Sequence, residues 1–263
     1  MNVELAEIES RVLGRNVLVI HEVDAGADFS VFEGSYIETY CPGYVSASVA
    51  LENVAAIHRI EDHGFRLVEC QLKMVLKLSQ PYDTTAYRYQ LERVTSQPAL
   101  DEVLQLAATS FEHDRFAMDP AIPRGVSGER YRLYTLKSYQ DPAESVYRLI
   151  DPDSGETLAF KTCRYISGSE VRLFLSGVHP AMKGLGLGPI SNYYYFNELL
   201  RLGVRKAHGY ISAHNYAACN MDLGLMGFRI VGSFAVFRKL YEESGLPKRA
   251  GRDIGHDIAT DDA

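Results

Sequence analysis

The 263-residue sequence predicts an α/β fold in which strands and helices alternate along most of the chain. The clearest strand spans residues 65–77, where apolar side chains alternate with polar ones as they do in a half-buried strand. A second strand, at 171–175, leads through a glycine-rich loop into a helix at 190–202. Strands and helices that follow one another in this way are typical of an α/β protein.

The remaining elements follow from local patterns. Short apolar or alternating runs bounded by turn residues predict strands at 18–20, 44–49, 87–94, 146–150, 157–164, 204–211 and 230–237. Apolar residues three or four positions apart predict helices at 51–63, 98–107, 129–139 and 216–224. Gly64 ends the first of these helices, and Pro98 opens the second. Segments 24–32 and 111–128, rich in Gly, Asp or Pro, are predicted to be loops.

The composition excludes several classes of protein. A net charge of −7 disfavours nucleic-acid binding, and the sequence has no apolar run long enough to span a membrane. The acidic N-terminus is unlike a signal peptide, so we expect a cytoplasmic protein. Four widely spaced cysteines indicate free thiols rather than disulfides or zinc ligands, and no metal site is expected: Cys41, Cys70, Cys163 and Cys219.

The most informative segment is 178–189, which reads VHPAMKGLGLGP. Its three glycines, Gly184, Gly186 and Gly188, let backbone N–H groups point towards one place without interference from a Cβ atom. The predicted helix directly behind them adds unpaired N–H donors and the positive end of its dipole, and Pro189 suits its first turn. The loop is therefore a candidate nest for an anion such as a pyrophosphate.

Two common phosphate-binding loops do not fit this spacing. A P-loop requires Gly-x4-Gly-Lys-Ser/Thr, which does not occur. A dinucleotide fingerprint requires Gly-x-Gly-x-x-Gly and a ribose-binding acid further on, and neither is evident. A glycine-rich turn without a ligand remains the alternative interpretation.

The loop instead resembles the acyl-CoA loop of the GNAT N-acetyltransferase superfamily, with Lys183 where Arg or Gln is more usual. The resemblance implies acetyl-CoA, or another acyl-CoA, as the cofactor. It also implies that the CoA pyrophosphate and the adjoining arm are bound by Val178, Lys183, Gly184, Leu185, Gly186, Leu187 and Gly188.

The segment after the loop strengthens this resemblance. A strand, Asn215, a helix, Gly227-Phe228 and another strand follow in the order found in GNAT proteins. The resemblance assigns Asn215 to the pantetheine arm, although an Asn at this place can also cap the helix. Together the motifs cover about residues 138–240 and imply a mixed central sheet flanked by helices.

One position departs from the family pattern. GNAT proteins often carry a tyrosine here, four residues before the Gly-Phe pair, as the acid for the leaving thiolate. Counting back from Gly227 reaches Leu223, whereas counting forward from Asn215 reaches Asp222, because the segment is one residue longer than usual. Asp222 is therefore a candidate acid only if its pKa is raised. His179, beside the cofactor loop, is a second catalytic candidate, or simply a solvated loop residue.

The first part of the chain carries a weak echo of this pattern. Ser46-Ala47, a helix, then Gly64-Phe65 and a strand mirror Ser212-Ala213, a helix, then Gly227-Phe228 and a strand. We therefore predict a degenerate GNAT-like lobe at 1–95, a GNAT acyl-CoA-binding domain at 96–242 and a disordered tail at 243–263.

The acceptor side is suggested by a looser resemblance. Residues 44–78 and 111–123 are similar to the TDP-fucosamine acetyltransferase type, which acetylates a nucleotide-linked amino sugar, although this chain lacks the Trp common in that group. The second segment supplies the candidate substrate-binding residues His113, Arg115 and Asp119. Arg115 could bind a substrate phosphate, or form a structural ion pair with Asp119. Asp119 could equally initiate a turn. Candidates for the base that deprotonates the amine are His113, Asp114, Asp119 and His179.

These observations predict an N-acetyltransferase that acts on a small amine, with a nucleotide-linked amino sugar as the first candidate. An antibiotic, a polyamine and a protein amine stay open as acceptors. A non-catalytic acyl-CoA sensor stays open too, because the tyrosine is missing. The acyl chain length is not fixed by the sequence, and a homodimer is one of the oligomeric states it leaves open.

Overall fold

The computed structural model describes residues 1–24, 26, 28–111 and 114–241, and these residues form one mixed sheet of ten strands. In order across the sheet, the strands are β1 (Val3–Leu5), β2 (Val17–Ile20), β3 (Tyr44–Ala50), β10 (Arg229–Leu240), β4 (Arg66–Lys77), β9 (Lys206–Ser212), β8 (Glu170–Val178), β7 (Thr157–Ser167), β6 (Glu144–Ile150) and β5 (Gln90–Arg93). Neighbouring strands are antiparallel except for β2–β3 and β8–β9, which are parallel.

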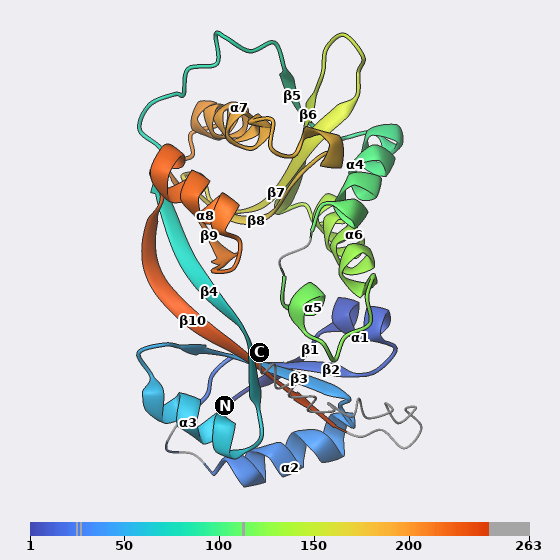
Figure 1. The fold of residues 1–263 in the computed structure, drawn as a ribbon, viewed down its shortest axis with the longest axis vertical. Coiled ribbons are helices and arrows are strands. Elements are labelled where there is room, and N and C mark those ends of the chain that lie inside the picture. The colour runs from blue at the N-terminus through green and yellow to red at the C-terminus, as the bar shows by residue number, and fades with distance from the viewer. Residues whose placement is uncertain (25, 27, 112–113, 242–263) are drawn as a thin grey trace, which may run out of the picture.

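Helices cover both faces of the upper part of the sheet (Figure 1). They are α4 (Gln97–Thr109) and α6 (Val126–Gln140) on one face, and α7 (Leu187–Arg201) and α8 (Tyr216–Met221) on the other. The side chains of β6 show why both faces are buried. Val146 packs in the cluster that includes α4, whereas its neighbour Tyr147 packs in the cluster that includes α7. Successive residues of a strand point to opposite faces, so the sheet lies between two helical layers.

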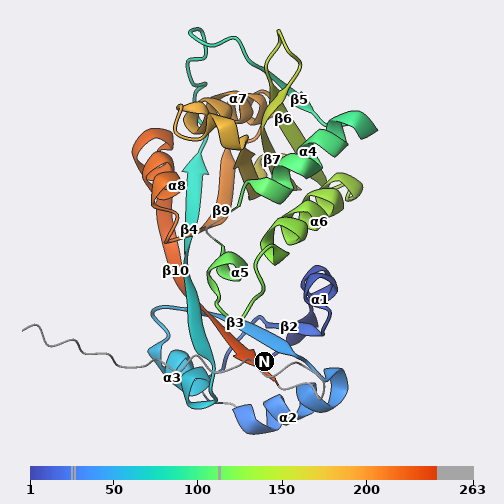
Figure 2. The same cartoon turned by 45° about the vertical axis from the view of Figure 1, so that its right-hand side comes forward.

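The lower part of the molecule contains a second, smaller core (Figure 1). There α2 (Phe29–Tyr40) and α3 (Val54–Asp62) pack against β2, β3 and the end of β10. The short helices α1 (Glu7–Leu13) and α5 (Arg115–Met118) lie between the lower strands and α6. Figure 2 shows β4 and β10 running from the lower part of the molecule into the upper part, so that they connect the two.

The two long strands belong to a strand–helix–strand unit that occurs twice, as β3–α3–β4 and as β9–α8–β10. Asn53 and Asn215 open the two helices, and each side chain accepts a bond of 3.2 Å from the backbone N–H three residues on. Gly64 and Gly227 follow the helices with φ of 77° and 80°, in the left-handed region that glycine adopts without strain.

The pairing between these units is symmetric. Ala50 of β3 pairs with Phe234 of β10, and Ser212 of β9 pairs with Gln71 of β4. The first strand of each unit therefore pairs with the last strand of the other. Gln71 and Phe234, each seven residues after its glycine, pair with each other at the centre. Ala50 of the first unit is therefore the counterpart of Ser212 in the second. The sequence pattern suggested Ser46 instead, which lies four residues earlier. Whether 1–95 and 96–242 behave as separate domains stays a prediction.

The predicted α/β class with a mixed sheet and flanking helices is confirmed. Two helices were missed, α1 and α2, and the loop expected at 24–32 is wrong from Phe29 onwards. The missed signal in α2 is the apolar spacing of Phe29, Phe32 and Tyr36, which was outweighed by the Gly and Asp residues at the start of the segment. Asp28 caps this helix by accepting a bond of 3.2 Å from the N–H of Val31.

Two further expectations concern other parts of the chain. The loop expected at 111–128 contains the one-turn helix α5, and α6 begins before it ends. The tail predicted to be disordered, 243–263, lies outside the described residues. None of the helices in the described part of the chain is long and apolar enough to cross a membrane.

Candidate functional site

An opening between β8 and β9 forms the centre of the candidate site. Their parallel pairing ends at Arg172 and His208, although β8 continues to Val178 and β9 to Ser212. Beyond this point no strand in the described part of the chain pairs with the edge of β8 that faces β9. Its backbone N–H and C=O groups are thus available to another partner.

A bulge lies in β8 beside this opening. Lys161 pairs with Ser176 and Cys163 with Leu173, so two residues of β8 stand opposite Thr162 alone. The hydroxyl of Thr162 takes up one of the freed groups, because it accepts a bond of 3.0 Å from the N–H of Leu175. Bulges bend a strand and turn its groups away from the regular ladder, as required where a ligand is to be met.

The glycine loop connects the end of β8 to α7. After Val178 the chain makes one turn of 3₁₀ helix, η1 (Pro180–Met182), and then passes through Gly184 and Gly186, whose φ angles are 78° and 80°. Gly186 is the N-cap of α7 and has no side chain to accept from the first N–H groups of the helix. The N-terminus of α7 therefore offers unpaired donors and a positive dipole end, the arrangement expected of an anion site.

The other loop residues hold this arrangement in place. Leu187 is buried and packs with Val178, whereas Lys183 and Leu185 are exposed. A Cβ atom on Gly188 would lie 3.3 Å from the Sδ atom of Met221, so this position favours a glycine for packing. All the residues predicted to bind the CoA phosphates are thus gathered around the start of α7.

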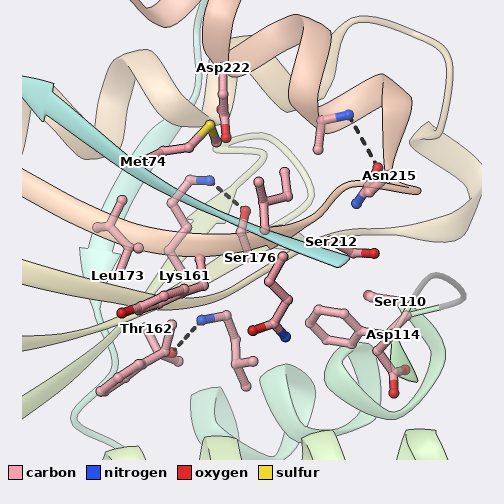
Figure 3. A pocket seen from close by; sticks show the side chains of 18 of the residues that line it. Met74, Ser110, Asp114, Lys161, Thr162, Leu173, Ser176, Ser212, Asn215 and Asp222 are labelled. Carbon is pink, nitrogen blue, oxygen red and sulfur yellow. Dashed lines mark hydrogen bonds between the residues drawn. The ribbon is translucent and has the colours of Figure 1, made fainter. Parts of the chain in front are cut away.

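Asn215 lies at the start of α8, on the wall of a cavity that the opening leads into. The cavity has a volume of about 370 Å³, and its walls come from β4, β7, β8, β9, α5, α6, α7 and α8. Figure 3 shows Asn215 on one side of it, with its Oδ1 atom bonded to the N–H of Ala218. The amide thus caps α8 and still borders the cavity, so both roles considered for it are structurally compatible.

Lys161, Ser176 and Asp222 form a cluster in the wall nearest α7 and α8. Lys161 comes from the buried middle of β7, is only 6% exposed, and donates a bond of 2.7 Å from Nζ to the Ser176 Oγ. Figure 3 shows the carboxyl group of Asp222 pointing towards this pair. Burial lowers the pKa of Lys161 to about 8, with Asp222 opposing the change. Burial raises the pKa of Asp222 to about 6, with Lys161 opposing it.

A π-helical turn, η2 (Asp222–Met226), explains how Asp222 reaches this place. The segment between Asn215 and Gly227 is one residue longer than the family spacing, and a π turn accommodates an extra residue inside a helix. As a result Asp222 lines the cavity while Leu223 is 38% exposed. Of the two residues considered for the tyrosine position, Asp222 lines the cavity and Leu223 does not.

Charged side chains from β4, α5 and α6 line the far end of the cavity. Glu69 is buried, and this burial raises the pKa of its carboxyl group, although bonds from Ser212 and Gln71 oppose the change. Asp114 accepts bonds from the N–H of Phe116 and the hydroxyl of Ser127.

The arginines at this end share one buried carboxylate. Arg115 lies 3.7 Å from Glu9, and Arg130 donates a bond of 2.9 Å to the same Oε1 atom. Burial would raise the pKa of Glu9, but Arg130 and its other partners outweigh this and hold it below its usual value. The Nε atom of Arg115 has no partner among the described atoms, so this side chain retains a donor.

The other acceptor and catalytic candidates lie elsewhere. Asp119 is fully buried and bonded to Arg238 at 2.9 and 3.3 Å, so the ion pair considered between Arg115 and Asp119 is wrong. Asp119 also accepts from the N–H of Ala121, in agreement with a turn. His179 is not among the cavity residues; its Nδ1 atom accepts from the N–H of Ala181. His113 lies outside the described residues.

No protein-family model matches the sequence, and a search of curated proteins finds no match. Solved structures are more informative. A GCN5-related N-acetyltransferase from Sphaerobacter thermophilus is 15% identical with a TM-score of 0.65, over 90% of this chain and 76% of that one. This is the GNAT fold.

Two further solved structures with the GNAT fold resemble the chain. A tandem GNAT protein from the clavulanic acid biosynthesis pathway is 11% identical with a TM-score of 0.57, over 82% of this chain and 70% of that one. The glucosamine N-acetyltransferase region of a fungal multi-domain β-N-acetylglucosaminidase is also 11% identical, with a TM-score of 0.56, over 80% of this chain and 27% of that one.

Within this GNAT fold, three cavity residues were not predicted from the sequence: Lys161, Ser176 and Glu69. The signal for Lys161 was a lone charge in the apolar run of residues 158–163, and Glu69 was treated as the polar half of an alternating strand. Ser176 carries no signal of its own, since its place beside Lys161 follows from strand register. Among the described residues, no group of three His, Cys, Asp or Glu side chains could hold a metal ion.

Proposed function

We propose that the chain is an N-acyltransferase that transfers the acetyl group of acetyl-CoA to a primary amine. The single observation that carries this proposal is the opening between β8 and β9 beside the glycine-capped N-terminus of α7. The anion site at the start of α7, the Asn215 amide on the cavity wall and the open edge of β8 would take the pyrophosphate, the pantetheine arm and the thioester of acetyl-CoA, respectively. The GNAT fold of the neighbours supports the same assignment.

In this proposal each group of residues has a separate task. The N–H groups from Gly184 to Gly188 bind the pyrophosphate, and Asn215 bonds to the pantetheine arm. The free edge of β8 donates N–H bonds to the thioester oxygen, which gains charge as the amine attacks. The acetyl group itself is supplied by acetyl-CoA. The first strand–helix–strand unit, which lacks a glycine loop, serves as a degenerate lobe that completes the sheet.

The acceptor enters from the end of the cavity formed by β4, α5 and α6. Glu69 and Asp114 suit an amine, because carboxylates attract an ammonium ion and can take up its proton before attack. Arg115 adds a cation to the cavity wall, which suits a neighbouring phosphate or sugar hydroxyl. An amino sugar, free or nucleotide-linked, is our first candidate, and the glucosamine N-acetyltransferase region with the same fold is compatible with it.

The proposal is tested first by calorimetry with acetyl-CoA. Binding should then be followed by release of CoA when an amine acceptor is added, measured with a thiol reagent against amino sugars, TDP- and UDP-linked amino sugars, polyamines, aminoglycosides and peptides. Binding without release in any of these mixtures would favour an acyl-CoA sensor. Absence of binding would contradict the proposal altogether.

The chain offers a matched control for Asn215. Asn53 caps α3 with the same 3.2 Å bond but lies in the other unit, away from the cavity. Asn53→Ala and Asn215→Ala should each destabilise the protein by about 1 kcal/mol, because each loses a helix cap. Only Asn215→Ala should also weaken acetyl-CoA binding. Equal affinities in the two variants would remove Asn215 from the cofactor site.

A further inference from the structure

We propose that the ammonium group of Lys161, held in place by Ser176, faces the sulfur atom of CoA and gives it a proton as the thiolate leaves. This inference rests on the proposed function. It assigns the role that a tyrosine has in many GNAT proteins to a residue on a different element, β7, and it makes Asp222 the partner of the donor rather than the donor itself.

The position of Lys161 carries the argument. Its side chain leaves the middle of β7 on the face covered by α7, which is shown by its Nζ atom lying 5.7 Å from the ring centre of Tyr195. Ser176, its bonding partner, lies on the part of β8 that has separated from β9. Both residues line the cavity. The ammonium group is therefore fixed at the point where the free edge of β8 would hold a thioester.

The charge of Lys161 depends on few neighbours. Among the described residues, the titratable groups nearest to it are Tyr147 of β6, Cys163 of β7, Tyr195 of α7, Cys219 of α8 and Asp222 of η2. Burial raises the pKa of each of these tyrosines and cysteines, so all four stay neutral near pH 7. Asp222 alone is charged, and it favours the protonated form of Lys161.

Asp222 is less suited to donate the proton itself. Its pKa of about 6 leaves it mostly ionised at neutral pH, when a carboxylate has no proton to give. Lys161, with a pKa of about 8, is mostly protonated under the same conditions. A donor of this acidity is matched to a thiol, whose pKa is roughly 8.5, so the transfer is nearly balanced in free energy.

The step conserves atoms and electrons. The lone pair of the amine nitrogen forms the new C–N bond to the acyl carbon, and the electron pair of the broken C–S bond moves to sulfur. Lys161 gives one proton from Nζ to that sulfur atom and becomes neutral. The nitrogen of the amide product loses one proton to water, and Lys161 later regains one from solvent. Ser176 positions Nζ and exchanges no proton.

The test needs no acceptor, because CoA itself presents the sulfur atom. Binding of CoA and of desulfo-CoA, which lacks the sulfur, is measured by calorimetry in buffers with different ionisation enthalpies, which reports the protons exchanged. At pH 7 Lys161 and the thiol of free CoA each carry a proton, whereas the bound pair shares one proton between Nζ and sulfur, so binding should release about one proton. At pH 9.5 the lysine is neutral and CoA is already ionised, so binding should instead take up about one proton. Desulfo-CoA should show neither effect.

Variants separate Lys161 from Asp222. Lys161→Met has a side chain of similar length and should lose the proton exchange with CoA and about tenfold in CoA affinity, while binding desulfo-CoA as the parent does. Asp222→Asn should still exchange protons on binding CoA. The pH at which release turns into uptake should be lower than in the parent, because Asp222 favours the charged form of Lys161.

Three results would overturn the inference. The first is equal proton exchange for CoA and desulfo-CoA in the parent, a result that does not depend on any variant folding. The second is full proton exchange in Lys161→Met. The third is loss of the exchange in Asp222→Asn alone, which would make Asp222 the donor. If acetyl-CoA, CoA and desulfo-CoA all failed to bind, both the proposed function and this inference would be rejected. If all three bound without proton exchange, only this inference would be rejected.

Discussion

At the scale of single residues, the burial of the Lys161 ammonium group opposes folding. Lys161 is 6% exposed, and its ammonium group has one hydrogen-bond partner, the hydroxyl of Ser176, and one neighbouring carboxylate, Asp222. A charge removed from water and only partly compensated destabilises the folded state, and this is why burial lowers its pKa. A cost of this kind is expected where a residue serves chemistry rather than stability.

This cost predicts a dependence of stability on pH. The folded pKa of Lys161 is about 8, below its usual value of 10.5, so between these values the unfolded chain binds more protons than the folded one. Stability should therefore rise with pH across this window, by about 3 kcal/mol at roughly 1.4 kcal/mol for each pKa unit. Lys161→Met has no buried ammonium group, so its free energy of unfolding should exceed that of the parent by the largest amount at pH 7, and the difference should shrink by pH 10.5. Urea unfolding of both proteins at several pH values measures it, and parallel curves would contradict the burial cost.

At the scale of elements, the N-terminus of α7 carries the cofactor assignment. Its cap is a glycine in the left-handed region, so no side chain occupies the N–H groups of its first turn. α6 begins in the same way, with Gly125 as cap at a φ of 90°, but it lies away from the glycine loop. Neither glycine has an atom within 4 Å of where a Cβ would be. The starts of the two helices therefore share a local conformation and differ in their surroundings.

We expect Gly186→Ala and Gly125→Ala to lose similar amounts of stability, about 1 to 2 kcal/mol each, because both place an L-residue in the left-handed region. Only Gly186→Ala should lower acetyl-CoA affinity, by tenfold or more, since its new methyl group lies where the pyrophosphate meets the backbone. Melting temperatures and calorimetry on both variants give the comparison. An affinity unchanged in Gly186→Ala would point to a loop without a ligand.

The elements of the second half were more predictable than those of the first. The strand, glycine loop and helix from 171 to 202 have strong local signals, and the loop residues lie together as expected. α2 was missed because Gly and Asp residues precede its apolar positions, and α1 because it has only seven residues. The Lys161–Ser176 pair could not be predicted, because it depends on the register and bulge between β7 and β8, which single-sequence patterns do not fix.

At the scale of the whole molecule, the two strand–helix–strand units cannot be separated without breaking the sheet. β4 belongs to the first 95 residues yet lies between β9 and β10, and β10 lies between β3 and β4. A boundary drawn at residue 95 in the sequence therefore does not correspond to a boundary in the sheet. The lower core also depends on Ala235 and Phe237 of β10.

This arrangement predicts a single cooperative unfolding transition. Circular dichroism and the fluorescence of tyrosines in the two parts should change at the same denaturant concentration, because loss of β4 or β10 removes strands from both cores. Fragments 1–95 and 96–242, produced separately, should each lack stable structure and should regain it when mixed. Two separate transitions, or a folded fragment 1–95, would instead support independent domains.

The exchange of β4 and β10 also sets the order of events during synthesis. β10 is made after every other strand of the described chain, and until it arrives the place between β3 and β4 is empty. At the usual pace of translation, the roughly 150 residues from the end of β4 to the start of β10 take on the order of ten to thirty seconds. During that time the nascent chain presents open strand edges that could pair with other chains. The first half of this protein should therefore need protection by chaperones on the ribosome, although it is the half without the glycine loop.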